Sequence, residues 1–262
     1  MKTRLDAELV RRELARSREH AADLIESRSV IVSGIPATKP ASQVDAETSI
    51  VLQGDRDDFV SRGGHKLAGA LDVFTGVEIA GRTCLDAGAS TGGFTDVLLR
   101  RGAKLVVAVD VGYGQLAWEL RQDARVKILD RTNIRHLSGD QISEDIDLVV
   151  ADLSFISLSL VVPALAAVSR PDADFVLMVK PQFEVGREKL GAGGVVRDPA
   201  LRRAAVLDIA ESAYDVGLGT LGIAASPLPG PAGNVEYFLW LRRGAPEINE
   251  QALDDAIAAG PE

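Results

Sequence analysis

Short apolar segments alternate with helical segments over most of the chain, and this alternation constrains the fold more than any other feature. The apolar segments have the length and composition of buried strands. We expect strands at residues 83–87, 104–109, 126–129, 147–151, 175–179, 221–225 and 235–241, and helices at residues 94–101, 115–121, 157–169 and 199–216. This pattern predicts an α/β fold in which helices cover both faces of a parallel, doubly wound sheet.

The first 55 residues follow a different pattern. From Arg4 onward, apolar residues recur at helical spacing, and a second helix is expected from Ser17. Short strands are expected at residues 30–32 and 49–53. We therefore expect a small α+β domain at residues 1–55, a linker at residues 56–62, the α/β domain at residues 63–244 and an acidic tail at residues 245–262.

The charge is distributed unevenly along the chain. The formal net charge is −9, but residues 1–40 contain eight Lys and Arg against six Asp and Glu, so that segment is positive. An acidic chain with a basic N-terminal segment remains compatible with a nucleic-acid partner, because such contacts depend on local charge.

Several classes of protein are disfavoured. The longest apolar-leaning stretch, residues 155–168, is shorter than the roughly 20 residues of a membrane helix, and we see no secretory signal, so we expect a cytoplasmic protein without a membrane partner. A single cysteine, Cys84, and three widely separated histidines give no disulfide and no metal site.

The strongest local motif joins an expected strand to an expected helix through a glycine-rich turn, Leu85-Asp-Ala-Gly-Ala-Ser-Thr-Gly-Gly-Phe94. Ser90 replaces the middle glycine of a dinucleotide fingerprint, and no Gly-Lys-Ser/Thr sequence closes a phosphate-binding loop. Asp110 ends the next strand, where a carboxylate can accept hydrogen bonds from ribose hydroxyls. With Asp86 opening it, the motif resembles motif I of S-adenosylmethionine (SAM) methyltransferases. A glycine turn needed only for tight packing is the alternative.

Four charged residues stand at or near expected strand and helix ends: Lys66, Asp152, Lys180 and Glu236. Asp152 and Lys180 follow apolar strands, so both should emerge at the carboxyl edge of the sheet, where ligands bind in such folds. Taken singly, each of the four is also compatible with an ordinary solvated position.

Together and in this order, the four resemble the Lys-Asp-Lys-Glu tetrad of FtsJ-like ribose 2'-O-methyltransferases. Longer blocks resemble the TlyA (hemolysin A) family: Val60-Ser-Arg-Gly-Gly-His-Lys66, residues 85–95, Asp110-Val-Gly-Tyr-Gly-Gln-Leu116, Ala151-Asp-Leu-Ser-Phe-Ile-Ser157, Val179-Lys-Pro-Gln-Phe-Glu184, and residues 226–231 and 233–238. The segments Arg4-Leu-Asp6, Ser17-Arg18 and Lys39-Pro40 resemble an S4 RNA-binding domain, although Ser27-Arg-Ser29 stands where such domains commonly have a glycine.

This resemblance implies a Rossmann-like SAM-dependent methyltransferase sheet after a small S4-like domain. It implies transfer of the SAM methyl group to the 2'-hydroxyl of cytidine in ribosomal RNA, in the 16S and 23S molecules, with the assembly state left open. The catalytic residues would be Lys180 as general base, Asp152 to orient it, Lys66 to hold the developing alkoxide or the target phosphate, and Glu236 to align Lys66. The cofactor would be held by Asp86, Gly88, Ser90, Gly92, Gly93, Phe94, Asp110, Asp130 and Asp152.

Basic residues supply the expected RNA contacts: Arg4, Arg11, Arg12, Arg16, Arg18, Lys39 and Arg62. Such contacts bind phosphates and position the substrate without reading its sequence. The alternative is a solvated helix face, because Glu8, Glu13 and Glu19 are interleaved with these residues.

Two further features carry predictions. The glycine-rich segment 184–196 interrupts the alternation of strands and helices and has the length of a lid or binding segment. Phe155 is close enough to Asp152 to contact the cofactor or a flipped base, unless it packs in the core.

Three other functions are alternatives: a non-catalytic RNA-binding factor on a methyltransferase fold, a membrane-active hemolysin and a small-molecule methyltransferase. No amphipathic basic helix supports the hemolysin.

Overall fold

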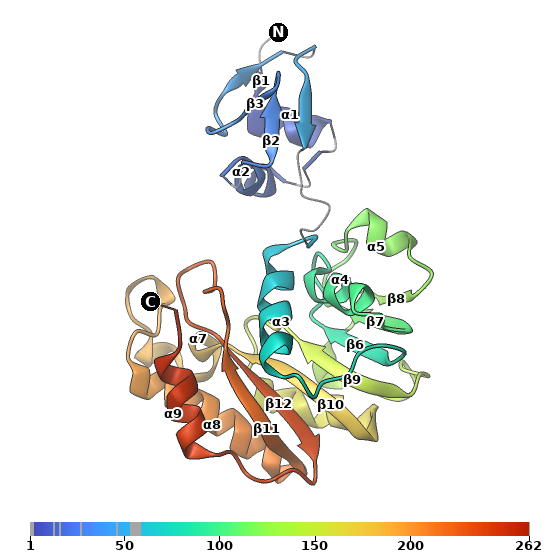
Figure 1. The fold of residues 1–262 in the computed structure, drawn as a ribbon, viewed down its shortest axis with the longest axis vertical. Coiled ribbons are helices and arrows are strands. Elements are labelled where there is room, and N and C mark those ends of the chain that lie inside the picture. Colours follow the sequence, from blue (N-terminus) through green and yellow to red (C-terminus); the bar gives the residue numbers. More distant parts are fainter. Residues whose placement is uncertain are drawn as a thin grey trace. The chain divides into compact units, whose positions relative to one another are not determined.

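The computed structural model describes residues 3–12, 14–15, 17–26, 28–45, 47–52 and 59–261. The chain divides into two compact units, residues 1–58 and 59–262, and Figure 1 labels most of their elements. The expected domain boundary at residue 55 and the first part of the expected linker, residues 56–58, lie outside the described residues.

The smaller unit is an α+β fold. Its elements are β1 (Thr3–Arg4), α1 (Leu5–Arg11), α2 (Arg18–Glu26), β2 (Val30–Val32), β3 (Ile35–Pro36), β4 (Gln43–Val44) and β5 (Ile50–Leu52). Strands β1 and β4 pair, and β2 lies between β3 and β5 in a second antiparallel sheet. The core lies between these sheets and the two helices, around the fully buried Leu5, Leu9, Ile25 and Val30.

The larger unit contains one seven-stranded sheet. Its strands are β6 (Thr83–Ala87), β7 (Leu105–Val109), β8 (Val126–Leu129), β9 (Ile146–Ala151), β10 (Ser169–Val179), β11 (Leu218–Ala225) and β12 (Tyr237–Arg243), in the spatial order β11-β12-β10-β9-β6-β7-β8. Its helices are α3 (Arg62–Val73), α4 (Gly93–Arg100), α5 (Trp118–Gln122), α6 (Val162–Ala167), α7 (Pro181–Glu184), α8 (Pro199–Asp215) and α9 (Glu250–Ala258). The α/β class expected from the sequence is confirmed.

The expectation of a wholly parallel sheet is wrong at one strand. Strands β6 to β10 pair in parallel, whereas β12 runs antiparallel to both β10 and β11. No helix lies between β11 and β12, so residues 226–236 simply turn the chain back. A parallel pairing would have needed a crossover connection.

Two expected segments also differ in the structure. Only residues 158–160 and 162–167 of the expected helix 157–169 are helical, and β10 begins already at Ser169. The segment expected as an acidic tail contains α9, which begins after the capping residue Asn249 and buries Leu253 completely. Leu253, Ala256 and Ile257 of α9 stand at helical spacing, but the acidic composition of this segment conceals that signal.

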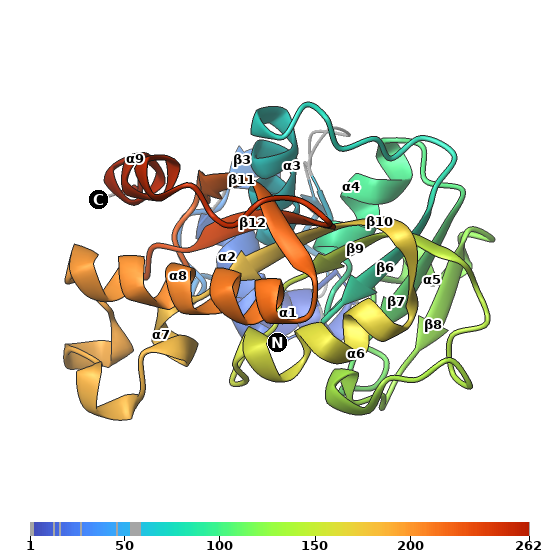
Figure 2. The ribbon, with the colours of Figure 1, turned by 90° about the horizontal axis from the view of Figure 1, so that it is seen from below.

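Successive side chains of each strand point to opposite faces of the sheet, and each face has its own core. Helices α3 and α4 cover one face, which includes Cys84, Leu148, Met178 and Phe238. Helices α6 and α8 cover the other face, which includes Leu85, Val149, Val179 and Tyr237. Figure 2 shows the two helical layers on either side of the strands.

A buried carboxylate joins three parts of the sheet. Asp174 on β10 is fully buried, and its oxygens lie 2.7 Å from Arg82 Nη1 and 2.8 Å from Arg242 Nη2. It also accepts a 2.8 Å hydrogen bond from Trp240 Nε1 on β12. Removing this carboxylate leaves two guanidinium groups and an indole donor without their shared acceptor.

We predict that Asp174→Ala lowers the free energy of unfolding of the larger unit by about 3 kcal/mol, the typical cost of breaking a buried ion pair from one side. Urea unfolding followed by tryptophan fluorescence measures this, because both tryptophans, Trp118 and Trp240, belong to this unit. The control is the exposed Asp172→Ala, which should change stability by less than about 0.5 kcal/mol. Equal effects of the two substitutions would contradict the assignment.

Candidate active site

The first part of the candidate site is an ion pair between α3 and the residue before β12. Lys66 Nζ lies 2.5 Å from Glu236 Oε2, and both residues are buried, at 7% and 1% exposure. Burying two charges is costly unless they are paired, so each of these side chains holds the other in place.

The second part is an ion pair at the ends of β9 and β10. Lys180 Nζ lies 2.6 Å from Asp152 Oδ1 and donates a 3.0 Å hydrogen bond to Ser154 Oγ. Lys180 is buried, whereas about a quarter of the Asp152 side chain is exposed. A ligand can therefore reach this pair from the Asp152 side.

The strand register places both pairs on the same face of the sheet. Val179 on β10 is opposite Tyr237 on β12, so Lys180 and Glu236 each lie one residue beyond the last paired position. By the two-residue alternation both belong to the face that α3 and α4 cover, as does Asp152, one residue after Ala151. Lys66 reaches that face from α3. The structure thus brings the four charged residues together as two ion pairs, while their chemical roles stay predictions.

The glycine-rich turn presents carboxylates more than free amides. The amides of Gly88 and Ala89 both donate to the Val109 carbonyl, at 2.8 and 3.1 Å, and the amide of Ser90 donates to Asp110 Oδ2 at 2.8 Å. At residues 88–90 the backbone amides are therefore used within the protein. A pyrophosphate needs amide donors, whereas a ligand with hydroxyls and positive charge fits a turn lined by acceptors.

Glycine is required in this turn for close packing. Gly88 has φ +86°, and a Cβ there would lie 2.6 Å from the Asp152 carbonyl oxygen. A Cβ on Gly92 would meet Leu120, and one on Gly93 would meet Ser61. Tight packing, the alternative explanation of the glycine motif, therefore applies to all three glycines. At Gly88 the neighbour that leaves no room for a side chain is the backbone of Asp152, one of the four charged residues.

Asp86 is the most buried carboxylate near the turn. It is fully buried, Thr95 Oγ1 donates a 2.7 Å hydrogen bond to its Oδ2, and its Oδ1 has no partner among the described residues. Burial raises the pKa of Asp86 to about 7, the Thr95 hydrogen bond opposes that rise, and the nearby Asp152 charge adds to it. An unpartnered acceptor here is available to a ligand donor.

The other residues predicted to bind the cofactor differ in the groups that they can present to a ligand. The two oxygens of Asp110 accept hydrogen bonds from the amides of Ser90 and Gly112, which fixes the carboxylate at the end of β7. Asp130, after β8, accepts from the Gly114 amide and lies 3.6 Å from Arg121. The Phe94 ring is buried against Phe238, so only its backbone could face a ligand.

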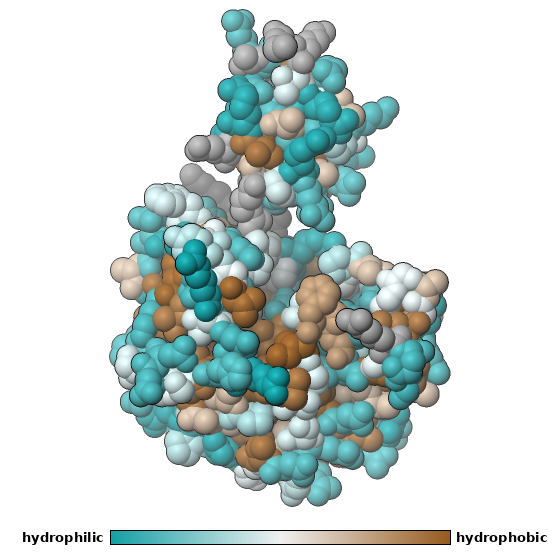
Figure 3. Space-filling model, turned by 180° about the vertical axis from the view of Figure 1, so that it is seen from behind, coloured by the Kyte–Doolittle hydropathy of each residue, from teal (hydrophilic) through white to brown (hydrophobic). Residues whose placement is uncertain are grey.

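An exposed aromatic side chain lies beside the second ion pair. Phe155 is 91% exposed and has φ +63°, an unusual backbone conformation for a large side chain. Its ring centroid is 5.0 Å from that of Phe183, and Lys180 Nζ is 5.9 Å from the Phe183 ring. The core alternative for Phe155 is wrong. Figure 3 shows other hydrophobic side chains that reach the surface of the larger unit between hydrophilic ones.

In the smaller unit, two buried carboxylates organise the predicted RNA-binding arginines. Asp6 binds Arg4 and Arg18, at 2.8 and 2.9 Å, and Glu8 binds Arg11 and Arg12, at 2.6 and 2.7 Å. The Arg4 hydrogen bond holds the pKa of Asp6 well below its usual range. Glu8 is therefore buried and paired, and does not lie on a solvated helix face. The four arginines outnumber the two carboxylates, so this cluster keeps a net positive charge.

These arginines are not equally available. Arg12 also donates to the carbonyls of Thr48 and Asp45, so its guanidinium holds the smaller unit together. About half of each of the Arg4, Arg11 and Arg18 side chains is exposed. Lys39 and Arg62 are exposed as well, and Arg16 lies outside the described residues.

Three residues that complete the site were not singled out in the sequence. They are Thr95, Ser154 and Phe183. Ser154 and Phe183 lie within the quoted motifs, two and three residues after Asp152 and Lys180. Thr95 follows the glycine turn, and only its contact with the buried Asp86 reveals its role.

Comparisons with known proteins agree with this geometry. Residues 59–243 match the FtsJ-like methyltransferase family, and residues 3–50 match the S4 domain family. The chain is 57% identical over 258 residues, 98% of this chain and 96% of the relative, to a Mycobacterium tuberculosis protein named 16S/23S rRNA (cytidine-2'-O)-methyltransferase TlyA.

Two more distant relatives cover similar lengths. A Campylobacter jejuni protein named 23S rRNA (cytidine-2'-O)-methyltransferase TlyA is 31% identical, over 86% of this chain and 93% of the relative. A solved structure from Streptococcus thermophilus, which carries a hemolysin name, has a TM-score of 0.79 and 37% identity and covers 98% of this chain and 94% of that one. Within the described residues, every helix is too short or too polar to cross a membrane.

The buried Asp86 predicts a pH dependence of stability. Because its pKa in the folded protein, about 7, exceeds the ordinary value of 3.8, the folded state binds more protons than the unfolded state between about pH 4 and 7. The free energy of unfolding of the SAM-free protein should therefore fall as pH rises through this window, by up to about 4 kcal/mol relative to Asp86→Asn. Urea unfolding at a series of pH values measures the difference.

The exposed Asp140→Asn serves as the control, and its stability should follow that of the unmodified protein at every pH. Parallel curves for the unmodified protein and Asp86→Asn would show that Asp86 does not titrate in this window.

Proposed function

Because the chain belongs to the TlyA family of FtsJ-like methyltransferases, with an S4 domain before the methyltransferase domain, we propose that it transfers the methyl group of SAM to the 2'-hydroxyl of cytidine in ribosomal RNA. The observation that carries this proposal is the placement of two lysine–carboxylate pairs, Lys66–Glu236 and Lys180–Asp152, on one sheet face beside the glycine turn.

The residues around the turn suit SAM better than a dinucleotide. Asp110 and Asp130 are held by backbone amides with their carboxylates at strand ends, where they can accept hydrogen bonds from ribose hydroxyls. The free oxygen of Asp86 and the exposed side of Asp152 add acceptors and negative charge. Bound SAM supplies a methyl group that its positively charged sulfonium makes electrophilic.

Lys180 acts as the general base in this proposal. A ribose hydroxyl is a weak nucleophile, so removal of its proton as it reacts is the main task of the protein. The ion pair with Asp152 and the hydrogen bond to Ser154 fix the position of Nζ. Nζ then takes the hydroxyl proton as the methyl group moves from the sulfonium to the ribose oxygen.

Lys66 supplies a fixed positive charge. Glu236 holds it through a 2.5 Å ion pair, and burial keeps water from competing for it. A preorganised cation of this kind stabilises negative charge that develops on the ribose oxygen or lies on the target phosphate.

Phe155 and Phe183 form an aromatic platform for the target base. Proteins that recognise particular nucleotides of RNA commonly bind bases that have left their stack, and leaving the stack has an energetic cost. An exposed ring beside Lys180 can stack on the displaced base and compensate in part for that cost.

We extend the proposal to both ribosomal RNAs, 16S and 23S. The relative named for both is 57% identical to this chain, whereas the relative named for 23S alone is 31% identical. A protein with this substrate acts where ribosomes are found, in the cytoplasm.

We predict that Lys180→Ala lowers the methyl-transfer rate by about 10²–10⁴-fold, the usual contribution of a general base. The measurement is transfer of tritium from labelled SAM to isolated ribosomal subunits at saturating substrate, with the modified nucleotide mapped by primer extension at low dNTP. Lys180→Arg keeps the charge but cannot accept a proton, so it should be as slow as Lys180→Ala.

The matched control is Lys127→Ala, which removes a lysine that pairs with Glu144 at the far edge of the sheet and should leave the rate unchanged. Rescue by arginine would assign Lys180 an electrostatic role only, and a near-normal rate for Lys180→Ala would remove it from the mechanism. Failure of the unmodified protein to label either subunit would overturn the proposed function.

The S4 domain predicts salt-dependent binding to ribosomal subunits. Arg11→Gln and Lys39→Gln should each reduce the slope of log affinity against log salt by about 0.7–0.9, as expected for one lost phosphate contact. Arg125→Gln, which removes an exposed arginine paired with Asp123 in the larger unit, should leave the slope unchanged. Affinities that do not vary with salt would place the RNA contacts elsewhere.

A further inference from the structure

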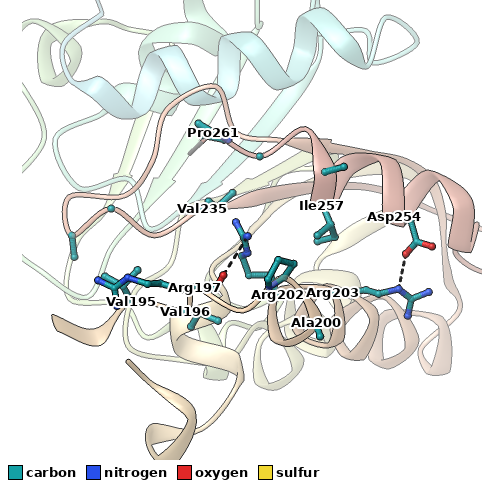
Figure 4. Close-up of a pocket in the computed structure, with 15 residues that line it drawn as sticks. Val195, Val196, Arg197, Ala200, Arg202, Arg203, Val235, Asp254, Ile257 and Pro261 are labelled. Carbon is teal, nitrogen blue, oxygen red and sulfur yellow. Dashed lines mark hydrogen bonds and ion pairs between the residues drawn. The ribbon is translucent and has the colours of Figure 1, made fainter. Parts of the chain in front are cut away.

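A cavity of about 820 Å³ lies in the larger unit on the sheet face opposite the two ion pairs. The first turns of α8, the loop before β12 and the C-terminal end of α9 enclose it (Figure 4). Its walls are largely apolar, with Val196, Val235, Ile257 and Pro261 among them. The volume lies within the range of small-molecule sites.

Arg202 points into this cavity from α8 (Figure 4). Its Nε is buried and has no hydrogen-bond partner, and its Nη2 reaches only the Arg197 carbonyl, at 3.4 Å. The described residues provide no carboxylate partner for it. The next residue, Arg203, differs, because it pairs with Glu250 at 2.8 Å and with Asp254 at 2.6 Å.

A second donor without an acceptor lies beside Arg202. Tyr237 is fully buried, and its hydroxyl proton has no acceptor within the described part of the chain. The hydroxyl is 3.3 Å from the place of a Cβ on Gly260, a residue that lines the cavity. Burial raises the pKa of Tyr237, while the charge of the nearby Arg202 and its approach to the hydroxyl oxygen oppose the rise, so the phenol keeps its proton at neutral pH.

Buried polar groups in proteins nearly always have partners. The phenol oxygen can accept a hydrogen bond from the Arg202 guanidinium, but that contact leaves the phenol proton and the Nε–H of Arg202 without acceptors. An oxyanion placed between them would accept from both. Arg197, exposed at the rim and without an ion pair in the described residues, adds a further positive charge.

We propose that this cavity binds a phosphate ester, with Arg202 and the Tyr237 hydroxyl as donors to the phosphate and the apolar walls against the rest of the ligand. The phosphate belongs either to a free small molecule or to the backbone of the RNA substrate. The site stands apart from the methyl-transfer residues, so its test does not depend on the proposed function.

The test is calorimetric titration of the full chain with ribose 5-phosphate, in the presence of S-adenosylhomocysteine to occupy the cofactor site. We expect saturable binding of one ribose 5-phosphate per chain, competition by inorganic phosphate, and no binding of ribose. Arg202→Gln should weaken binding at least tenfold, and Tyr237→Phe, which removes one oxygen from the core, should weaken it severalfold.

The control is Arg170→Gln, an exposed arginine outside the cavity, which should bind like the unmodified protein. Thermal unfolding of each variant confirms that it is folded. Absence of saturable binding to the unmodified protein, or equal binding by Arg202→Gln, would overturn the proposal.

Binding of ribosomal subunits by the same variants identifies the source of the phosphate. If the phosphate belongs to RNA, Arg202→Gln weakens subunit binding and ribose 5-phosphate competes with the subunit. If the ligand is a free phosphate ester, subunit binding is the same in both proteins while the calorimetric difference remains.

Discussion

The pleat of the central strands decides where the charged side chains of this protein lie. Each strand sends alternate residues to opposite faces, so one residue beyond the apolar run of β9 or β10 must face α3 and α4. A shift of one residue in either register would send Asp152 or Lys180 to the face of α6 and α8. The positions of Asp86 and Asp110 depend on the same alternation in β6 and β7.

The charges in this site also constrain what can bind there. The two lysines are each neutralised by a carboxylate, which leaves Asp86, Asp110 and Asp130 as additional acids near the glycine turn. Such surroundings disfavour an anionic cofactor and favour one that carries positive charge and hydroxyls. Burial is the main reason why Asp86 binds its proton tightly, and the nearby charges of Asp152 and Asp110 add to the effect.

The sequence predicted those parts of the structure that depend on local pattern. The order of strands and helices and the glycine turn follow from hydrophobic periodicity and local motifs, whereas the four charged residues were grouped by their resemblance to the FtsJ-like tetrad. Contacts between residues that are far apart in the sequence could not be predicted in this way. Glu8 was considered as part of a solvated helix face in the alternative interpretation, and Asp6 was not considered as a partner, because only the folded smaller unit shows that these two carboxylates bind four arginines.

Other differences have the same origin. The antiparallel direction of β12 depends on a loop that contains no helix, and the cavity around Arg202 exists only because α9 packs beside α8. Gly92 and Gly93 resemble ligand-binding glycines in the sequence, yet neighbouring side chains explain them in the structure. Contacts between distant segments carry this information, and no local pattern encodes it.

The central claim is that the two ion pairs work as one catalytic unit, and a double-mutant cycle tests it most directly. Single-turnover methyl-transfer rates would be compared for Lys180→Ala, Glu236→Gln and the double variant. Residues that act as a unit give strongly non-additive effects, so the double variant should be no more than about threefold slower than the slower single variant. If the two rate losses multiply instead, the pairs act independently and the account of a single site is wrong.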